Sequence, residues 1–102
     1  MSEQQPMSEA MFYILLALLH PGHGYGMMQR IRELSRGRID MGPGTLYGVL
    51  SRMRKEGLIK LTEQDERRKT YSITELGHRA LVLEYGRLQQ MVRDGRILEE
   101  EK

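Results

Sequence analysis

Residues 39–73 read IDMGPGTLYGVLSRMRKEGLIKLTEQDERRKTYSI. Within this segment Pro43 suits the first position of a helix, because its missing N–H would have no partner there. Gly57 suits the position just past a helix end, where the backbone often turns left-handed. Apolar residues recur between them at helical spacing, at Leu46, Val49, Leu50 and Met53. The segment therefore predicts an amphipathic helix from Pro43 to Glu56.

The opposite face of this predicted helix is small, hydroxylated and basic. It carries Thr45, Gly48, Arg52 and Lys55, flanked by Tyr47, Ser51 and Arg54. Such a face suits the major groove of DNA, because small residues allow close approach, arginine can bond guanine through two hydrogen bonds and threonine can contact the thymine methyl group. The alternative is an ordinary surface helix with a solvated basic face, since such faces are common.

A β-hairpin with a basic tip is predicted directly after this helix. Apolar residues flank the expected turn with the period of a strand, at Leu58, Ile59 and Leu61 before it and at Tyr71 and Ile73 after it. The tip, Glu63 to Lys69, ends in Arg67, Arg68 and Lys69. A turn has no structural need for three adjacent cations, whereas a surface that binds phosphate groups does. Helix and hairpin together predict the second half of a winged helix-turn-helix.

Five short segments resemble the PadR family of transcriptional regulators, in its short single-domain form. They are HGYG at 23–26, GPGTLY at 42–47, EGLI at 56–59, RRKTY at 67–71 and TELG at 74–77. The segments occur in the family's order and span most of the chain. The resemblance implies a mainly α (α+β) fold, which is a winged helix-turn-helix with a two-stranded β wing and a C-terminal dimerisation helix.

The resemblance also implies a sequence-specific DNA-binding regulator. It would act as a repressor, bind a palindromic operator in double-stranded DNA as a homodimer, and be released by a small hydrophobic effector. The residues expected at the DNA are Tyr25, Gly44, Thr45, Tyr47, Ser51, Arg52, Lys55, Arg67, Arg68 and Lys69. Three positions depart from the family pattern: Asp65 and Glu66 add negative charge to the wing tip, and Thr70 replaces a more usual aromatic residue.

The distribution of charge agrees with this interpretation. The chain has 102 residues, which fits one domain, and a formal net charge of +2. Residues 29–73 hold eleven Lys or Arg and six acids, a net charge of +5, whereas residues 1–28 carry −2 and residues 74–102 carry −1. The positive charge is therefore concentrated on the predicted helix and hairpin, as in a nucleic-acid binder.

The chain is expected to divide into a disordered N-terminus (1–7), a winged helix-turn-helix domain (8–73), a dimerisation helix (74–98) and a disordered acidic tail (99–102). The run from Ala10 to Leu19 is apolar on all sides, as in a buried helix, and a second helix is expected from Tyr25 to Ser35. The last helix needs a partner for its apolar face, which a second copy of the chain would supply. The expected dimer contacts are Phe12, Leu81, Tyr85, Leu88 and Val92.

Several classes of function are not expected. The sequence contains no cysteine, which excludes disulfides and thiolate chemistry. His20 and His23 lie in a loop without a third ligand nearby, so no metal site is predicted. Gly22–Gly26 joins two helices and does not follow a strand, so it is no nucleotide loop, and neither an enzyme nor a cofactor is expected. The apolar run is too short to span a bilayer, which favours a cytoplasmic protein.

The remaining alternative is a winged helix that serves as a protein-interaction module without binding DNA, since fold alone does not determine function. The net charge of +5 on residues 29–73 argues against it. The polar face of the predicted helix does so too, because protein interfaces tend to be apolar or aromatic at their centre.

Overall fold

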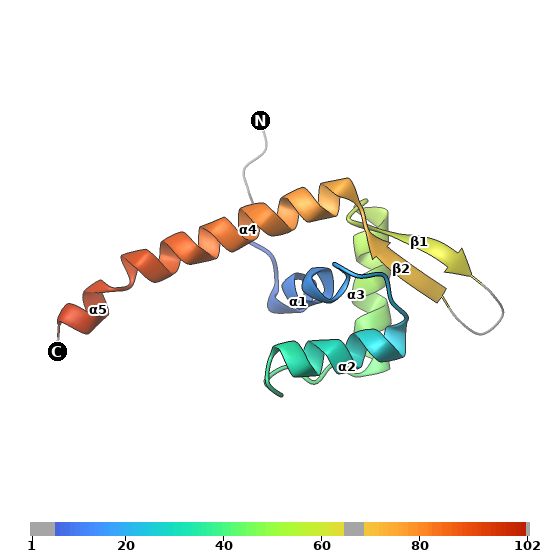
Figure 1. Cartoon of the computed structure of the whole chain (residues 1–102), viewed down its shortest axis with the longest axis horizontal. Coiled ribbons are helices and arrows are strands. Elements are labelled where there is room, and N and C mark those ends of the chain that lie inside the picture. Colours follow the sequence, from blue (N-terminus) through green and yellow to red (C-terminus); the bar gives the residue numbers. More distant parts are fainter. Residues whose placement is uncertain (1–5, 65–68, 102) are drawn as a thin grey trace.

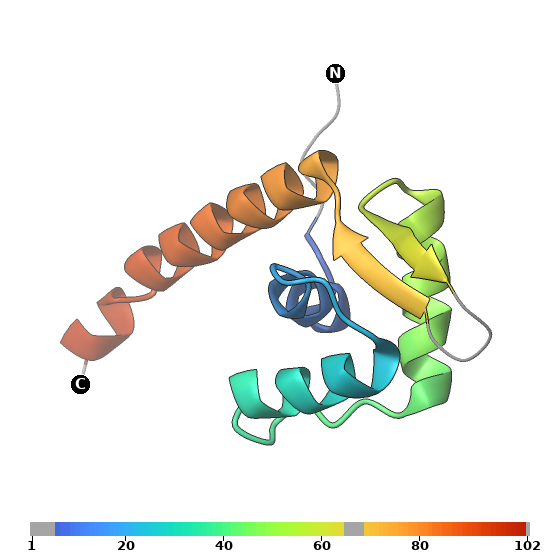
Figure 2. The ribbon, with the colours of Figure 1, turned by 45° about the vertical axis from the view of Figure 1, so that its right-hand side comes forward.

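The computed structural model describes residues 6–64 and 69–101. Its elements follow the order α1 (Glu9–Ala17), α2 (Gly24–Leu34), α3 (Pro43–Lys55), β1 (Ile59–Gln64), β2 (Lys69–Ile73), α4 (Glu75–Asp94) and α5 (Ile97–Glu100). The first helices and the hairpin form one body, and α4 leaves this body and projects to one side (Figures 1 and 2). The elements from α1 to α4 have the predicted order and type, a mainly helical fold with an antiparallel hairpin after α3.

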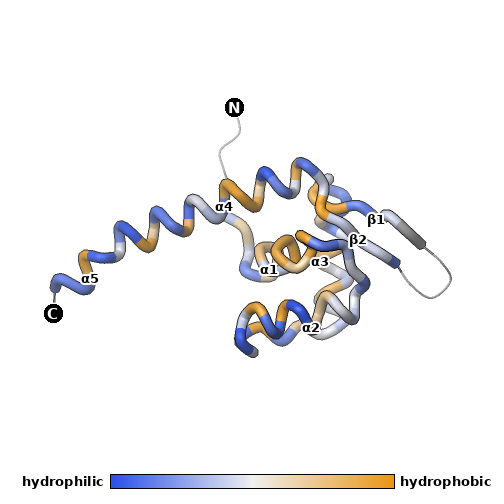
Figure 3. Tube along the Cα trace, in the orientation of Figure 1, coloured by the Kyte–Doolittle hydropathy of each residue, from blue (hydrophilic) through white to orange (hydrophobic). Residues whose placement is uncertain are grey.

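Helix α1 lies at the centre of the body. Ser8 caps its first turn by accepting a hydrogen bond from the Met11 N–H at 3.1 Å. Ile14, Leu15 and Leu18 are no more than 1% exposed, and Figure 3 shows α1 as an almost uninterrupted apolar segment surrounded by the other elements. The prediction of a buried helix is confirmed for the second half of α1, whereas Leu19, the last residue of the predicted run, lies beyond the helix and is 45% exposed.

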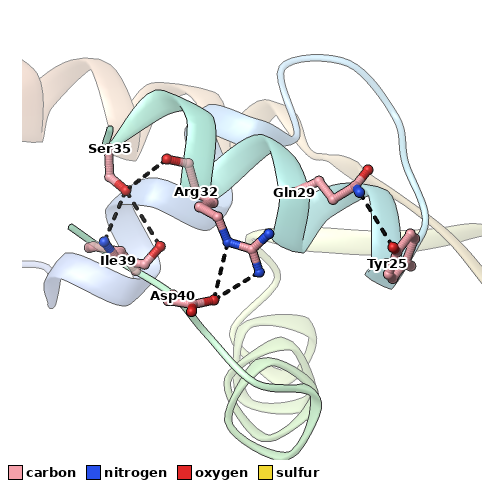
Figure 4. A network of polar contacts seen from close by, with 6 residues as sticks. All are labelled: Tyr25, Gln29, Arg32, Ser35, Ile39 and Asp40. Atoms are coloured by element: carbon pink, nitrogen blue, oxygen red, sulfur yellow. Dashed lines mark hydrogen bonds and ion pairs between the residues drawn. The ribbon is translucent and has the colours of Figure 1, made fainter. Parts of the chain in front are cut away.

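The segment between α2 and α3 is held by polar contacts (Figure 4). The buried hydroxyl of Ser35 accepts a hydrogen bond from the Ile39 N–H at 3.0 Å. Arg32 pairs with Asp40 at 2.9 Å. The chain turns through positive φ at residues 36 and 37, where Gly37 supplies the predicted helix stop. These contacts determine where α3 begins.

The wing is an antiparallel pair in which Ile59 lies opposite Ile73 and Leu61 opposite Tyr71. The register shifts between Leu61 and Glu63, so β1 contains a bulge that increases the local twist. The loop before α2 joins this sheet through an isolated bridge between Gly22 and Tyr71. Sequence reasoning treated that loop as a helix–helix turn and missed its attachment to the wing.

Helix α4 begins at a side-chain cap. The Thr74 hydroxyl donates to the Gly57 carbonyl at 2.6 Å and accepts from the Gly77 N–H at 3.0 Å. Gly57 has the left-handed φ of +81° that its position after α3 predicted. Thr74 therefore links the residue that follows α3 to the start of α4.

Two expectations for the C-terminal segment are wrong. The last helix was expected to continue to residue 98, but α4 ends at Asp94 and the chain turns at Gly95 before α5. The tail from residue 99 was expected to be disordered, but Glu99 and Glu100 belong to α5. Glycine is a poor helix former, and here the third glycine of the segment does end the helix. Within the described ranges, no helix is both long enough and apolar enough to cross a bilayer.

Candidate nucleic-acid interface

Helix α3 turns one stripe into the core and presents a polar ridge on its other side. Leu46, Leu50 and Met53 are at most 1% exposed. The exposed ridge is formed by Gly44, Gly48, Ser51 and Lys55, whose spacings of four, three and four residues keep them on one side of a helix. The ridge is narrow at its N-terminal end and carries a cation at its C-terminal end.

The glycines of this ridge have no role in the packing of the protein itself. A Cβ atom added to Gly44 or Gly48 would meet no atom of the described chain within 4 Å, and neither residue has a positive φ. Each glycine in a helix interior costs about 1 kcal/mol relative to alanine. Close approach of an external surface is the physical role that remains for them.

Thr45 and Arg52 lie on the flank of α3 that faces α1, away from the centre of the ridge. The Arg52 guanidinium lies 3.9 Å from the sulfur of Met11 in α1 and 3.8 Å from the Glu56 carboxylate. Thr45 lines a polar hollow together with Asp40. These two predicted contacts would therefore meet the edge of a docked duplex, since the ridge would occupy the groove.

Tyr47 packs against the start of α2. A Cβ atom at Gly24 would collide with the Tyr47 hydroxyl, so the ring lies directly over the Gly24 backbone. Two of the segments that carry the family resemblance thus touch in space. Tyr47 is 45% exposed, which leaves its outer edge available to DNA while its other edge sets the spacing between α2 and α3.

Tyr25 projects from the first turn of α2 and is 71% exposed. Its hydroxyl accepts a long hydrogen bond from the Gln29 amide at 3.4 Å (Figure 4). Such a large exposed fraction is not typical of a tyrosine that packs against its own chain. The side chain lies beside backbone N–H groups that a helix N-terminus leaves unpaired.

The structure separates cations that hold the fold together from cations that face solvent. Arg30 donates to the Ala17 carbonyl at 2.7 Å, and Arg38 pairs with Glu9 at 2.9 Å. In contrast, among the described side chains, those of residues 6–62 and 69–101, no carboxylate forms an ion pair with Arg54, Lys55 or Lys60. The sequence counts all these charges equally, and only the packing shows which remain available to a polyanion.

Arg54 was not among the predicted contacts. Burial raises the pKa of the Tyr71 phenol in β2, Tyr47 raises it further and Arg54 lowers it, so Arg54 lies within electrostatic range of the wing. Arg54 is exposed. Its position in the sequence, one residue past Met53 of the buried stripe, contained no signal that distinguished it from Arg52.

The wing contributes Lys69, which is exposed at the start of β2. Arg67 and Arg68, the other predicted wing contacts, lie outside the described residues, as do Asp65 and Glu66 of the tip. The proposed grip of the wing on phosphate therefore remains a prediction.

The histidine loop has a structural partner. The Nδ1 atom of His23 lies 3.3 Å from the Thr70 hydroxyl of β2. Among the residues that the structure describes, no three or more His, Cys, Asp or Glu side chains are grouped so as to hold a metal ion. His23 serves a contact between loop and wing, which its sequence spacing from His20 did not indicate.

The predicted dimer contacts fall into two groups. Phe12, Tyr85, Leu88 and Val92 line an apolar groove of about 420 Å³ between α1 and α4. Val92 is 70% exposed and Tyr85 56% exposed. Leu81 is different, because it is 5% exposed and belongs to the core of its own chain. Its assignment to the interface is corrected: position 81 precedes the point where α4 leaves the body.

A buried ion pair beside this groove was missed by sequence reasoning. Glu84 is 2% exposed, and the Arg87 guanidinium bonds both of its carboxylate oxygens, at 3.0 Å from Nε and 2.5 Å from Nη2. The hydrogen bond to Glu84 raises the pKa of Arg87. The pair allows a carboxylate to lie on the buried side of α4, since a buried charge needs a close partner.

Comparison with known proteins points to one family. The model described as "Transcriptional regulator PadR-like family" matches residues 14–82. An "Uncharacterized 37.1 kDa protein in transposon TN4556" of Streptomyces fradiae is 31% identical over 93 residues, 90% of this chain and 26% of that protein. "Transcriptional regulator YqjI" of Escherichia coli (strain K12) is 32% identical over 55 residues, 54% of this chain and 27% of that protein.

The chain thus spans about a quarter of the length of these two curated relatives. Among solved structures, a PadR family transcriptional regulator from Eggerthella lenta DSM 2243 superposes with a TM-score of 0.73. Its identity is 25%, and the alignment covers 87% of this chain and 80% of that chain. The family match over residues 14–82 includes α2, α3 and the hairpin, and α3 carries the exposed ridge.

Proposed function

Because the chain belongs to the PadR-like family of transcriptional regulators, we propose that it binds double-stranded DNA in a sequence-specific manner as a homodimer and represses transcription from a palindromic operator. The family confirms the resemblance drawn from the sequence. A family of regulators also agrees with the expectation that the chain is not an enzyme. The details of operator, dimer and repression are our proposal.

The exposed ridge of α3 is the observation that carries this proposal. It offers the groove two glycines without internal contacts and Lys55 without an ion-pair partner in the described chain. Arg54 and Lys60 extend the positive surface toward the wing. A close-approach surface bordered by unpaired cations matches a major groove bordered by phosphates.

A dimer is supported by the apolar surface of the projecting helices. Besides the groove residues, Met91, Ile97 and Leu98 are each more than half exposed on α4 or α5. A monomer rarely leaves so much apolar surface on one element uncovered. A homodimer with two-fold symmetry would place its two α3 helices in half-sites about 34–36 Å apart, which is one turn of DNA.

Two further parts of the proposal concern the effector and the location of the protein in the cell. Release by a small hydrophobic effector rests on the family resemblance, with the groove at Phe12 and Leu88 as the surface that such a ligand would meet. A cytoplasmic location rests on the cysteine-free composition and on the proposed DNA target.

The most direct test selects bound fragments from a random DNA pool. We expect enrichment of an inverted repeat whose half-site centres lie about 10 base pairs apart. Recovery of single half-sites would contradict the dimer. No enrichment over an unselected pool, with heparin bound equally well, would contradict sequence-specific recognition.

Gly48→Ala should change the stability of the protein and its affinity for the operator in opposite directions. The added methyl group meets open space, so we expect the free energy of unfolding to rise by about 0.5–1 kcal/mol. The same methyl group would hold the ridge away from the groove, and operator affinity should fall roughly tenfold, or about 1.4 kcal/mol. Urea unfolding and fluorescence anisotropy measure the two effects. Equal or tighter binding by the variant would show that Gly48 does not face DNA.

Arg67→Ala combined with Arg68→Ala should weaken binding to all DNA sequences alike. Each cation that releases a counterion contributes about 0.9 to the slope of log affinity against log salt, so the slope should flatten by about 1.8 for each protomer, or about 3.6 for the proposed dimer. Arg79→Ala, on the exposed side of α4 next to Glu75, is the matched control. An unchanged slope in the double variant would exclude the wing from the phosphate contacts.

A further inference from the structure

The loop before α2 is attached to the wing strand β2 at neighbouring points. The Gly22 N–H donates to the Tyr71 carbonyl at 3.0 Å, and the Tyr71 N–H donates to the Gly22 carbonyl at 2.9 Å. One residue along each segment, the His23 imidazole meets the Thr70 hydroxyl at 3.3 Å. A backbone pair and a side-chain pair thus lie side by side where the wing leaves the helices, as Figure 2 shows for the loop and β2.

Thr70 is held from the other strand as well. Its carbonyl accepts a hydrogen bond from the Thr62 hydroxyl at 3.1 Å, at the register shift between Leu61 and Glu63. Bulges bend a strand and change its direction. Thr70 therefore occupies the bend of the hairpin, with one strand on one side and the loop on the other.

His23 connects Thr70 of the wing to helices α2 and α3. It is the N-cap residue of α2, and within the described chain its side chain forms no capping hydrogen bond. The imidazole is therefore not engaged in holding the helix start. The next residue, Gly24, lies under the Tyr47 ring of α3. The His23–Thr70 contact thus joins the wing to a junction that also fixes α2 against α3.

We propose that His23 and Thr70 form a polar latch that positions the wing, and with it Lys69, relative to the N-terminus of α2 on the DNA backbone. The inference rests on the proposed DNA-binding function. Both residues act as positioning residues and need not touch the duplex. A two-stranded hairpin has little rigidity of its own, so its direction depends on contacts with the body. The latch lies one residue from Lys69 and controls where that cation meets phosphate.

Thr70→Val tests the latch because it removes the hydroxyl while keeping the shape and charge of the side chain. We expect operator affinity to fall about three- to tenfold. We also expect the salt slope to flatten by about 0.9 for each protomer, or about 1.8 for the proposed dimer, although no charge is changed, because one wing cation in each protomer loses its phosphate. Thr70→Ser keeps the hydroxyl and should restore both values. Ser72→Ala, on the same side of β2, is the control and should resemble the wild type.

His23→Leu should reproduce Thr70→Val, and the double variant should be no worse than either single one, because both remove the same contact. Additive losses would overturn the latch. A salt slope equal to that of the wild type in Thr70→Val would overturn it as well, even with reduced affinity, since a merely local loss of stability does not change the number of phosphates contacted.

Amide exchange in the free protein keeps this test separate from the proposed function. The Tyr71 N–H should exchange at least about tenfold faster in Thr70→Val than in the wild type or in Thr70→Ser. If the wild type binds no DNA, the proposed function fails. The exchange rate of the Tyr71 N–H then remains as the test of the His23–Thr70 contact. Unchanged exchange at Tyr71 would then overturn it.

Discussion

Gly77→Ala should lower the free energy of unfolding by about 3 kcal/mol or more, the upper end of the range for overpacking. A Cβ atom at this position would overlap the Leu58 carbonyl and press on the Ile73 side chain at 3.0 Å. The Leu58 carbonyl cannot withdraw easily, because it accepts the Thr74 N–H at 3.0 Å. Relief of the clash would therefore have to shift α4 away from the wing.

Gly86→Ala is the matched control in the same helix. No atom of the described chain lies within 4 Å of a Cβ atom added there, so the change should raise the free energy of unfolding by about 0.5–1 kcal/mol. Urea unfolding followed by circular dichroism, at one protein concentration for all variants, measures both effects. A Gly77→Ala variant that loses less than about 1 kcal/mol would show that α4 packs more loosely on Leu58 than its geometry indicates.

Leu88→Asp should abolish dimerisation and reduce operator affinity by a factor of about 100 or more, because two linked heads bind far more tightly than one. Leu88 lies in the apolar groove beside Phe12, Tyr85 and Val92. A carboxylate there would replace the apolar side chain of Leu88 and would have to lose its water on pairing, which is costly even though Arg93 and Arg96 also line the groove. Sedimentation would show a monomer, and gel shifts would show the weakened complex.

Leu83→Asp provides the control for this second variant. Leu83 is 60% exposed and lies five positions earlier in α4, on another side of the helix. The Leu83→Asp substitution should leave both the dimer and the affinity for the operator close to those of the wild type. A Leu88→Asp protein that stays dimeric would move the interface away from the groove, whereas monomers from both variants would show that the interface extends around α4.

Local sequence signals predicted the bounds of α3 closely. Pro43 begins α3 and Gly57 takes the left-handed conformation after it, as their chemistry required. Ser8 and Thr74 cap α1 and α4 for the same reason, since a cap depends on atoms within three residues. The helix break at Gly95 was missed, because glycine also occurs inside α4 at Gly86, where the helix continues.

The candidate site was predicted in part. Helical period alone placed Gly48 and Lys55 on one face with Ser51 beside it, and these residues are exposed. The period could not tell that Arg52 leans toward Met11 while Arg54 faces the wing. Nor could it tell that Leu81 faces the core and Leu88 a groove, because both lie on the same helical stripe and differ only in whether the body of the protein reaches them.

By itself, the order of residues determined the type of the elements from α1 to α4, the side-chain caps of α1 and α4, the polar and apolar sides of α3 and the segment that carries the positive charge. These properties depend on neighbours a few positions away. Tertiary structure alone decided that Gly24 meets Tyr47, that the Gly22 loop pairs with Tyr71, and that Arg30 and Arg38 serve the fold while Lys55 and Lys60 face solvent. Such contacts join residues far apart in the chain, so their energies depend on the packed geometry and leave no periodic trace in the sequence.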